Sequence, residues 1–471
     1  MIRPSPVEPA SPRSAGPRST PSPAANGSAV ERGYRTRAPV EIRTRPSLDV
    51  TLTGIVYCAM LLFMGLAAIN TQANLLFGVF GLMIGVLLIS GIISRWVLRH
   101  LTVRRDLPEY AAVGAPMRIT YEIDNRKRWW PTLSVTIAEL DAPGAFDRQP
   151  HAYVMHTAAG HQAVVAAEVV PMRRGLHRLD RYQVTTSFPF GFIRRAMMRR
   201  QADAVLVHPA QGAMEPAALT RFLSAESSGI SQRPREGGND EFYGAREYRP
   251  GDPVRMIHWR RSARMSGIRT PTAPQGTLIV KQMTRVSPPR LLLLVDTHAP
   301  AFAPEREMER EQELAARAAH QQRLADVERN LATAATLLAA ATRAGLSVGM
   351  IAPAGDAAQG SNDAAKWIDM SPERGKRHSR DMLTAMATVG SNTRLTTEDL
   401  VSHGAAQGGG ETTVVLITAD GGARRAGASA GGPRRVKRGN LMVLRTGGEE
   451  LDRWVRFSPD LDFTAMAADE A

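Results

Sequence analysis

Cysteine is almost absent from this sequence of 471 residues, in which Cys58 is the single example. One cysteine cannot form an intramolecular disulfide, so the composition excludes a small secreted scaffold held by disulfides. It also excludes a zinc site built from cysteine ligands. The sequence lacks the G-x-x-x-x-G-K-[ST] phosphate loop as well. Hydrolysis of a nucleotide by that device is therefore not expected of this chain.

Acidic residues are in the minority, with 45 aspartates and glutamates against 59 lysines and arginines and a formal net charge of +14. This excess favours an anionic partner: phospholipid, nucleic acid or an acidic protein surface. The alternative is an arginine-rich genome together with basic residues that flank membrane helices. The length predicts two or three domains rather than one.

Long apolar runs lie near the N-terminus, at Val50–Ile69 and Leu75–Leu98. The first has about 20 residues, enough to cross a hydrocarbon core of about 30 Å. The second stays apolar until Arg95, and a short uncharged link at residues 70–74 separates the two. A second run directly behind the first argues against a cleaved signal peptide. We therefore predict a transmembrane hairpin over residues 47–99, with spans at 50–69 and 75–98.

Basic residues flank this hairpin on both sides and are missing from its link, which predicts that both termini are cytoplasmic. Residues 1–46 are rich in Pro, Ser and Arg without hydrophobic periodicity, so we expect a disordered basic arm. Gly81 and Gly85 form a small-xxx-small pair that would allow helices to approach in a homo-oligomer. The flanking arginines are Arg32, Arg35, Arg37, Arg43, Arg45, Arg95, Arg99, Arg104 and Arg105.

Residues 101–212 carry the short patterns of β-strands. From Met117 to Asp124 apolar and polar residues alternate, which is typical of a half-buried antiparallel strand. Further strand-like runs, separated by Pro and Gly, predict a β-sandwich of immunoglobulin-like type. Trp129-Trp130-Pro131 is either a partner-binding patch or, as we favour, the closing end of the sandwich core. The further runs are Leu133–Leu140, Val164–Val170, Leu176–Val184 and Val205–His208.

The most distinctive stretch is Gly237–Arg264, in which charged and aromatic residues are interleaved. Pro250-Gly251 indicates a turn, after which Asp252 is placed to cap a short helix that begins at Pro253. Arg255 and Trp259 would then lie one turn apart on that helix, where they could stack. Because acidic residues accompany the arginines, the pattern favours a charge network over a bare cationic patch.

Three interpretations of this stretch compete. A basic helix with a tryptophan would suit nucleic acid or lipid headgroups, whereas a catalytic site would need a base, for which His258 is the candidate. We favour the third, a structural or partner-docking network in a motif region over residues 213–285, and do not expect nucleic acid as a partner. The expected motif residues are Asp240, Phe242, Arg246, Glu247, Tyr248, Asp252, Arg255, His258, Trp259 and Arg260.

This stretch resembles the signature of the bacterial family called domain of unknown function 58. Its pattern is G-x-D-x-F-x-x-x-R-x-Y-x-x-G-D followed by R-x-I-x-W-R-x-S-A, and Arg174–Arg178 and Phe188–Phe192 resemble two further family segments. The resemblance covers nearly everything after residue 50. It implies two membrane helices in the inner (plasma) membrane, a β-rich stretch, this motif and a von Willebrand A-like domain. The matching residues are Gly238, Asp240, Phe242, Arg246, Tyr248, Gly251, Asp252, Arg255, Ile257, Trp259, Arg260, Ser262 and Ala263.

Residues 286–471 alternate predicted strands and helices. The apolar run Leu291–Val295 is typical of a buried parallel strand, and the alternation that follows predicts a doubly wound α/β domain. The later elements are expected as a helix at 330–344, a strand at 347–352, a helix at 381–389 and strands at 413–418 and 441–444. A separate solvated helix is expected within 304–329, where Glu313 and Arg317 have helical spacing.

Two aspartates follow strands of this domain. Asp296 and Asp420 would lie at the carboxyl ends of their strands, where ligands bind in such sheets, and both suit Mg²⁺ or Ca²⁺. The domain is similar to a von Willebrand A domain, whose metal site begins Asp-x-Ser-x-Ser, but His298 and Pro300 replace the serines. We therefore expect no cofactor, with Mg²⁺ at Asp296 and Asp420 as the alternative.

Together these features predict a non-enzymatic, membrane-anchored adaptor or assembly factor. The family resemblance implies that it acts with a MoxR-type AAA+ ATPase. One alternative is a metal-dependent protein-binding module. A second is a hydrolase that uses Asp240, Glu247 or His258.

Overall fold

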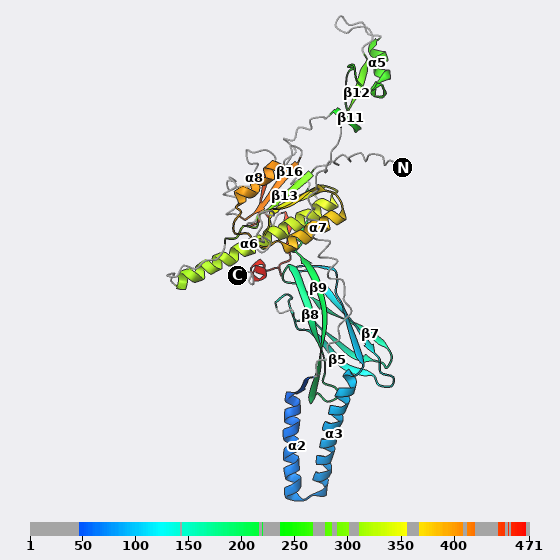
Figure 1. The fold of residues 1–471 in the computed structure, drawn as a ribbon, viewed down its shortest axis with the longest axis vertical. Helices are drawn as coiled ribbons and strands as arrows, with labels where there is room; N and C mark the ends of the chain where they lie inside the picture. Colours follow the sequence, from blue (N-terminus) through cyan, green and yellow to red (C-terminus); the bar gives the residue numbers. More distant parts are fainter. Residues whose placement is uncertain are drawn as a thin grey trace, which may run out of the picture.

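The computed structural model of the chain describes residues 47–141, 144–215, 219, 236–266, 278–284, 290–300, 310–355, 367–407, 412–419, 441–447, 451 and 454–467. Residues 1–46, which are expected to be a disordered basic segment, lie outside this description. A helical hairpin lies at one end of the molecule, a β-rich unit and an α/β unit follow, and a small β-hairpin with a helix lies at the opposite end (Figure 1).

The helical hairpin consists of α2 (Leu52–Thr71) and α3 (Asn74–Leu98). Both helices are long and apolar enough to cross a membrane, and few of their residues are buried within the protein. The first helix begins later than expected, because Ser47–Val50 forms strand β1 and pairs with the β-rich unit. Thr51 caps α2, and its side chain accepts a hydrogen bond from the Gly54 amide at 3.1 Å.

The β-rich unit has two sheets that pack face to face. Its further strands are β2 (Leu101–Asp106), β3 (Tyr110–Ala112), β4 (Met117–Asn125), β5 (Thr132–Glu139), β6 (His151–Thr157), β7 (Gln162–Val169), β8 (Gly175–Thr186) and β9 (Ile193–His208). One sheet has the order β1-β9-β8-β5-β6, with β3 beside β9, and the other has the order β2-β4-β7. The alternation predicted for β4 is confirmed, because Ile119, Tyr121 and Ile123 are buried while Arg118 and Glu122 are exposed.

A buried ionic network lies between these sheets. Arg105, expected as a membrane-flanking arginine, has a fully buried side chain on β2. Its Nη1 donates to Glu139 Oε2 at 2.7 Å, and its Nη2 donates to Asp203 Oδ2 at 3.1 Å. Tyr121 Oη donates to Glu139 Oε1 at 2.8 Å. Arg105 follows the hairpin in sequence as expected, but its side chain is buried, because two carboxylates of the neighbouring sheet pair with its charge between the two sheets.

The α/β unit is built on a sheet with the order β15-β14-β13-β16-β17. These strands are β13 (Arg290–Val295), β14 (Ser347–Pro353), β15 (Trp367–Glu373), β16 (Thr412–Thr418) and β17 (Leu441–Arg445). The strands are parallel except for β15, which pairs antiparallel with β14 at one edge. The continuous apolar run of β13 reflects burial on both faces, as parallel strands require.

Helices cover both faces of this sheet. They are α6 (Arg310–Arg343), α7 (Lys376–Thr388) and α8 (Thr397–Gln407). Leu291 and Leu293 pack in one core with α6 and α7, whereas Leu292 and Leu294 pack against Leu400 of α8. The two helices expected within 304–329 and over 330–344 are one continuous helix, whose first half is exposed beyond the sheet (Figure 1).

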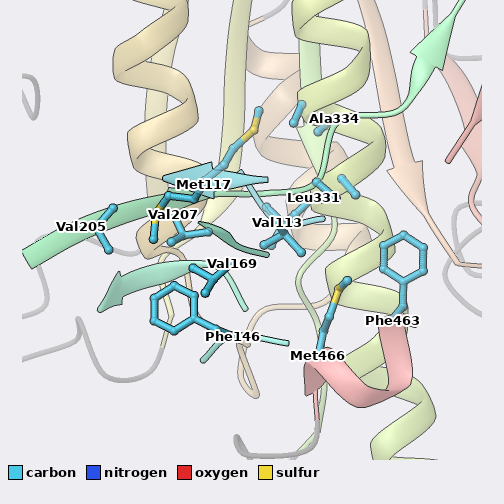
Figure 2. Packing of buried hydrophobic residues seen from close by; sticks show 14 of the residues in the cluster. Val113, Met117, Phe146, Val169, Val205, Val207, Leu331, Ala334, Phe463 and Met466 are labelled. Carbon is cyan, nitrogen blue, oxygen red and sulfur yellow. The ribbon is translucent and has the colours of Figure 1, made fainter. Parts of the chain in front are cut away.

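The β-rich and α/β units share one hydrophobic core. Val113 and Val205 of the β-rich unit lie in one cluster with Leu331 of α6 and with Phe463 and Met466 of the short helix α11 (Phe463–Ala467) (Figure 2). Strands β10 (Ala213–Met214) and β18 (Val455–Arg456) add a backbone ladder between the units. The two units are therefore packed as one body rather than joined by a loose linker.

Candidate functional site

The motif region forms a projecting arm. It consists of β11 (Glu236–Glu247), the 3-10 turn η1 (Val254–Met256), α5 (Trp259–Ser266) and β12 (Ile279–Thr284). Strands β11 and β12 pair antiparallel, with two register shifts near the start of β11. The arm lies at the end of the molecule opposite to helices α2 and α3 (Figure 1).

Backbone and hydroxyl contacts hold α5 against β12. The His258 amide donates to the Ile279 carbonyl at 2.7 Å. Ser262 Oγ donates to the His258 carbonyl at 3.2 Å and accepts from the Ile279 amide at 2.8 Å. Ile257 is buried at the same junction. These contacts fix the position of Trp259, the first residue of α5.

Arg246 and Asp252 form the ion pair of the arm. Nη1 donates to Oδ2 and Nη2 donates to Oδ1, both at 2.8 Å, which is the bidentate arrangement. Asp252 Oδ2 also accepts from the Arg249 amide at 2.9 Å, and the Asp252 amide closes the predicted Pro250-Gly251 turn on the Arg249 carbonyl. The hydrogen bonds from Arg246 hold the pKa of the Asp252 carboxyl below its usual range.

Two local expectations for the arm are wrong. Asp252 does not cap a helix that begins at Pro253, because its carboxylate is occupied by Arg246 and the turn, and a 3-10 turn without a side-chain cap follows. Arg255 and Trp259 are not on a common helix, because the chain is extended at Ile257 before α5 begins. The stacking expected for that pair needed a continuous helix.

The other expected motif residues are spread over the arm rather than gathered in one pocket. Asp240 and Phe242 lie on β11, but their side chains are outside the described residues. Glu247 is exposed at the end of β11, and Tyr248 and His258 are half-buried. The described contacts do not bring Glu247 and His258 together.

The outer surface of the arm combines apolar and cationic side chains. Val254 is 63% exposed and Trp259 is 60% exposed. Exposed apolar side chains of this size, surrounded by charge, are typical of a protein-binding surface. The exposed arginines on this surface are Arg255, Arg260, Arg261 and Arg264.

Asp296 lies where the sequence predicts, at the carboxyl end of β13, and is held by neutral donors. Its Oδ2 accepts from Thr397 Oγ1 at 2.8 Å and from Thr418 Oγ1 at 2.6 Å. Its Oδ1 accepts from the His298 amide at 3.0 Å. The carbonyl oxygen of Asp296 accepts from Asn330 on α6 at 2.7 Å. The carboxylate therefore ties the start of α8 and the end of β16 to the segment that follows β13.

This constellation is only part of a metal centre. Asp296, Thr397 and Thr418 offer one carboxylate and two hydroxyl oxygens, whereas Mg²⁺ takes about six oxygen ligands. Asp420 lies outside the described residues. Within the described residues, no three His, Cys, Asp or Glu side chains gather in one place. The chemistry of the oxygens suits Mg²⁺, but water or further groups would have to complete the coordination.

Arg174, from the first of the two further family-like segments, joins the two units. Its guanidinium forms an ion pair with Glu328 of α6 and donates to the Val389 carbonyl at 2.6 Å. The Gly212 amide adds a hydrogen bond to Thr336 Oγ1 at 2.8 Å. This segment therefore has a structural contact across the interface.

The other family-like segment, Phe188–Phe192, joins the β-rich unit to the hairpin. Thr51 Oγ1 donates to the Gly191 carbonyl, and the Thr51 amide donates to the Phe192 carbonyl at 3.1 Å. Phe192 stacks on Tyr57 of α2 at 4.1 Å between ring centroids. A Cβ atom on Gly54 would overlap the Phe192 carbonyl oxygen. Only glycine allows this close approach of helix and loop.

The sequence did not indicate Thr397, Thr418, Glu328 or the partners of Arg105. Each contact joins residues more than 30 positions apart, so no local spacing reveals it. The available signal was weaker: Thr418 ends an apolar strand, as a residue at a ligand-binding edge would.

No protein-family model matches the sequence, and no curated protein matches it. Among solved structures, the chain is similar to the GH20 exo-β-N-acetylglucosaminidase from Vibrio harveyi, in complex with N-acetylglucosamine. The identity is 12% and the TM-score is 0.14, and the match covers 47% of this chain and 45% of that chain. The chain thus spans less than half of that enzyme, and a similarity this low carries no argument about fold or activity.

Proposed function

We propose that the chain is a two-pass membrane protein that acts as a docking adaptor. Helices α2 and α3 would cross a bilayer, and their exposed apolar side chains support this, including Leu62, Phe63 and Leu82. Arg95 and Arg99 lie at the end of α3 beside the β-rich unit, and the link at the other end has no basic residue. This charge distribution supports cytoplasmic termini by the positive-inside rule, and the family resemblance supports a bacterial inner membrane.

The finer fold assignments are part of this proposal. We propose that the β-rich unit is an immunoglobulin-like sandwich and that the α/β unit is von Willebrand A-like. The order β15-β14-β13-β16-β17, with an antiparallel edge strand and helices on both faces, supports the second assignment. The family resemblance supports both.

The observation that carries the adaptor role is the surface of the arm. Its ion pair is partly buried and holds the turn, whereas the side chains of Val254, Trp259 and the neighbouring arginines are exposed. The arm that carries them lies at the end of the molecule opposite to the hairpin (Figure 1). A hydrophobic anchor within a basic rim fits a partner that offers an apolar pocket with acidic surroundings. Following the resemblance, the partner is a MoxR-type AAA+ ATPase, to which the hydrolysis belongs, and this chain is not an enzyme.

Affinity purification of the full chain from detergent-solubilised membranes tests this function. We expect an AAA+ ATPase to co-purify with the wild-type chain and to be lost from Trp259→Ala, because truncation removes the exposed anchor. Leu314→Ala is the matched control, since Leu314 on α6 is also 60% exposed but lies away from the arm. Recovery of no such ATPase, or equal recovery with Trp259→Ala, would contradict the proposal.

The hydroxyls around Asp296 favour a second candidate, a metal-dependent protein-binding module. Asp296, Thr397 and Thr418 would hold Mg²⁺, which would supply a positive charge for an acidic group of a partner. Thermal unfolding with Mg²⁺ or with EDTA tests this candidate. A rise in melting temperature with Mg²⁺ that disappears in Asp296→Asn supports it, and identical curves for the wild-type chain contradict it.

A further inference from the structure

Exposed tryptophans gather at the end of the β-rich unit that faces the hairpin. Trp129 is 83% exposed, so the expectation that it closes the sandwich core is wrong. Trp130 is 39% exposed and lies edge-on to Trp96 of α3 at 6.4 Å between ring centroids, and Trp96 is itself 49% exposed. The loop between β4 and β5 and the last turn of α3 thus share one aromatic surface.

The length of α3 determines where this aromatic surface would lie relative to the membrane. Its 25 residues extend roughly 37 Å at 1.5 Å per residue, against a hydrocarbon core of about 30 Å. The last turn, with Arg95 and Trp96, therefore projects into the headgroup layer. Lys127 holds the β4–β5 loop there, because its Nζ donates to the carbonyls of Trp96 at 3.2 Å and Val97 at 2.6 Å.

The loop between β8 and β9 reaches the same level from the side of α2. Phe190 is 50% exposed and stacks on Phe192 at 5.7 Å, and Phe192 is tied to the start of α2 by Thr51. Aromatic side chains at this height match the belts that membrane proteins place at the boundary between hydrocarbon and water.

Cationic groups accompany these aromatics. Helix α3 packs against β9, and the Nε of Arg195 on β9 is buried without a hydrogen-bond partner among the described residues. Burial, and secondly the positive charge of Arg95, lowers the pKa of Arg195 from its usual value. Arg128 lies over the ring of Trp129 at 5.3 Å. Arg95 in the last turn of α3 and Arg195 on the strand that packs against α3 thus supply positive charge on this side of the hairpin, which suits a phosphate group.

We propose that these residues form a collar that binds the headgroup layer of the membrane. Trp96, Trp129, Trp130 and Phe190 lie among the headgroups, and Arg95 and Arg195 bind the phosphate of an anionic phospholipid. The collar is continuous with the exposed apolar surface of the hairpin, and its charge complements the lipid, so the bilayer is its occupant rather than a soluble protein. The proposal rests on the membrane insertion proposed above.

Fluorescence quenching tests the aromatic part. The full chain is reconstituted in phosphatidylcholine nanodiscs with or without lipid brominated on the acyl chains, because bromine quenches tryptophan only at short range. We expect the emission lost on bromination to be smaller in Trp129→Phe than in the wild-type chain. Trp259→Phe, which removes a tryptophan of the arm, should lose the same emission as the wild-type chain.

Equal quenching in Trp129→Phe and the wild-type chain would overturn the collar. Extraction of native membranes with alkaline carbonate measures the insertion of the hairpin independently of the quenching experiment. A chain that resists extraction but shows no quenching of Trp129 contradicts the collar alone. A chain that is extracted contradicts the membrane proposal itself.

The phosphate site is tested by thermal unfolding in nanodiscs. We expect the melting temperature to rise when anionic phosphatidylglycerol replaces part of the phosphatidylcholine, and the rise to disappear in Arg95→Gln/Arg195→Gln. Arg95→Lys/Arg195→Lys should keep it, as should Arg200→Gln/Arg317→Gln, which removes two exposed arginines elsewhere. Inorganic phosphate added to phosphatidylcholine nanodiscs should not reproduce it. A full rise in the Arg95→Gln/Arg195→Gln variant, or no rise in the wild-type chain, would overturn the site.

Discussion

Two arginine–carboxylate pairs with nearly the same contact distance have different roles in this molecule. Arg105 contacts Glu139 at 2.7 Å inside the sandwich, where both side chains are 0% exposed. Arg246 contacts Asp252 at 2.8 Å in the arm, where the side chains are 23% and 15% exposed. The contact distances do not distinguish the two pairs, but the exposure of their side chains to solvent does. The buried pair is part of the core, whereas the pair in the arm shapes a turn beneath an exposed surface.

Removal of Arg105 should have the largest effect on stability. Arg105→Met leaves Glu139 and Asp203 without their counter-charge, and such a break costs about 3–5 kcal/mol. Thermal unfolding in detergent measures this as a large drop in melting temperature. Arg104→Met, the exposed neighbour on the same strand, is the control and should behave like the wild-type chain. Equal melting temperatures for the two variants would contradict the buried network.

Asp296 is a buried carboxylate held by neutral hydroxyl and amide donors, whereas Glu139 is held by an arginine. Substitution of Asp296 tests whether neutral donors make a similar contribution to the stability of the fold. Asp296→Ala leaves the hydroxyls of Thr397 and Thr418 and the His298 amide without their acceptor. We expect a loss of about 3 kcal/mol, measured as reduced thermal stability. Asp296→Asn keeps one acceptor oxygen and should lose less. If the alanine variant is as stable as the wild-type chain, the three hydrogen bonds do not hold α8 and β16 against the end of β13.

His208 is a titratable group that is buried in its neutral form, in contrast to Arg105 and Asp296. Burial, with a smaller contribution from Arg380, lowers the pKa of His208 to about 4. The folded state keeps the imidazole neutral, while the unfolded state takes up a proton below about pH 6.5, so stability falls as the pH drops from 6.5 to 4. The expected loss is about 2 kcal/mol by pH 5. In His208→Gln, melting curves at pH 7 and pH 5 should differ less than in the wild-type chain.

The pair in the arm should have the smallest effect on stability. Asp252→Asn removes the charge of a pair that solvent partly reaches, with side chains 23% and 15% exposed, and ion pairs near the surface contribute little. We expect an almost unchanged melting temperature but weaker recovery of the AAA+ ATPase, since the turn that positions the outer surface is loosened. A large fall in melting temperature would contradict this, because it would mean that the Arg246–Asp252 pair stabilises the fold as the buried pair of Arg105 does.

Part of the fold was predictable because local pattern and burial agree. The alternation of β4 is explained by one buried face, and the continuous apolar run of β13 by burial on both faces. Strand β15 and helix α8 were not predicted. Both carry mixed, half-exposed residues at the edge or on the outer side of the sheet, so their periodicity is weak.

The contacts of the candidate site also divide into those that the sequence predicts and those that it does not. Arg246 and Asp252 are six residues apart, and the sequence predicted a charge network there. The burial of Arg105 could not be predicted, because its partners lie on strands 34 and 98 residues away. The exposure of Trp129 could not be predicted, because the sequence of a loop gives no sign of which way an aromatic side chain faces.

The hairpin is attached to the sandwich at both of its ends, and this has a mechanical consequence. Thr51 ties the beginning of α2 to the loop before β9, and Lys127 ties the end of α3 to the loop after β4. Only two residues connect the helices at the far side, Gln72 and Ala73. The hairpin is thus attached to the β-rich unit at the start of α2 and at the end of α3, so a tilt of the helices would be transmitted to that unit.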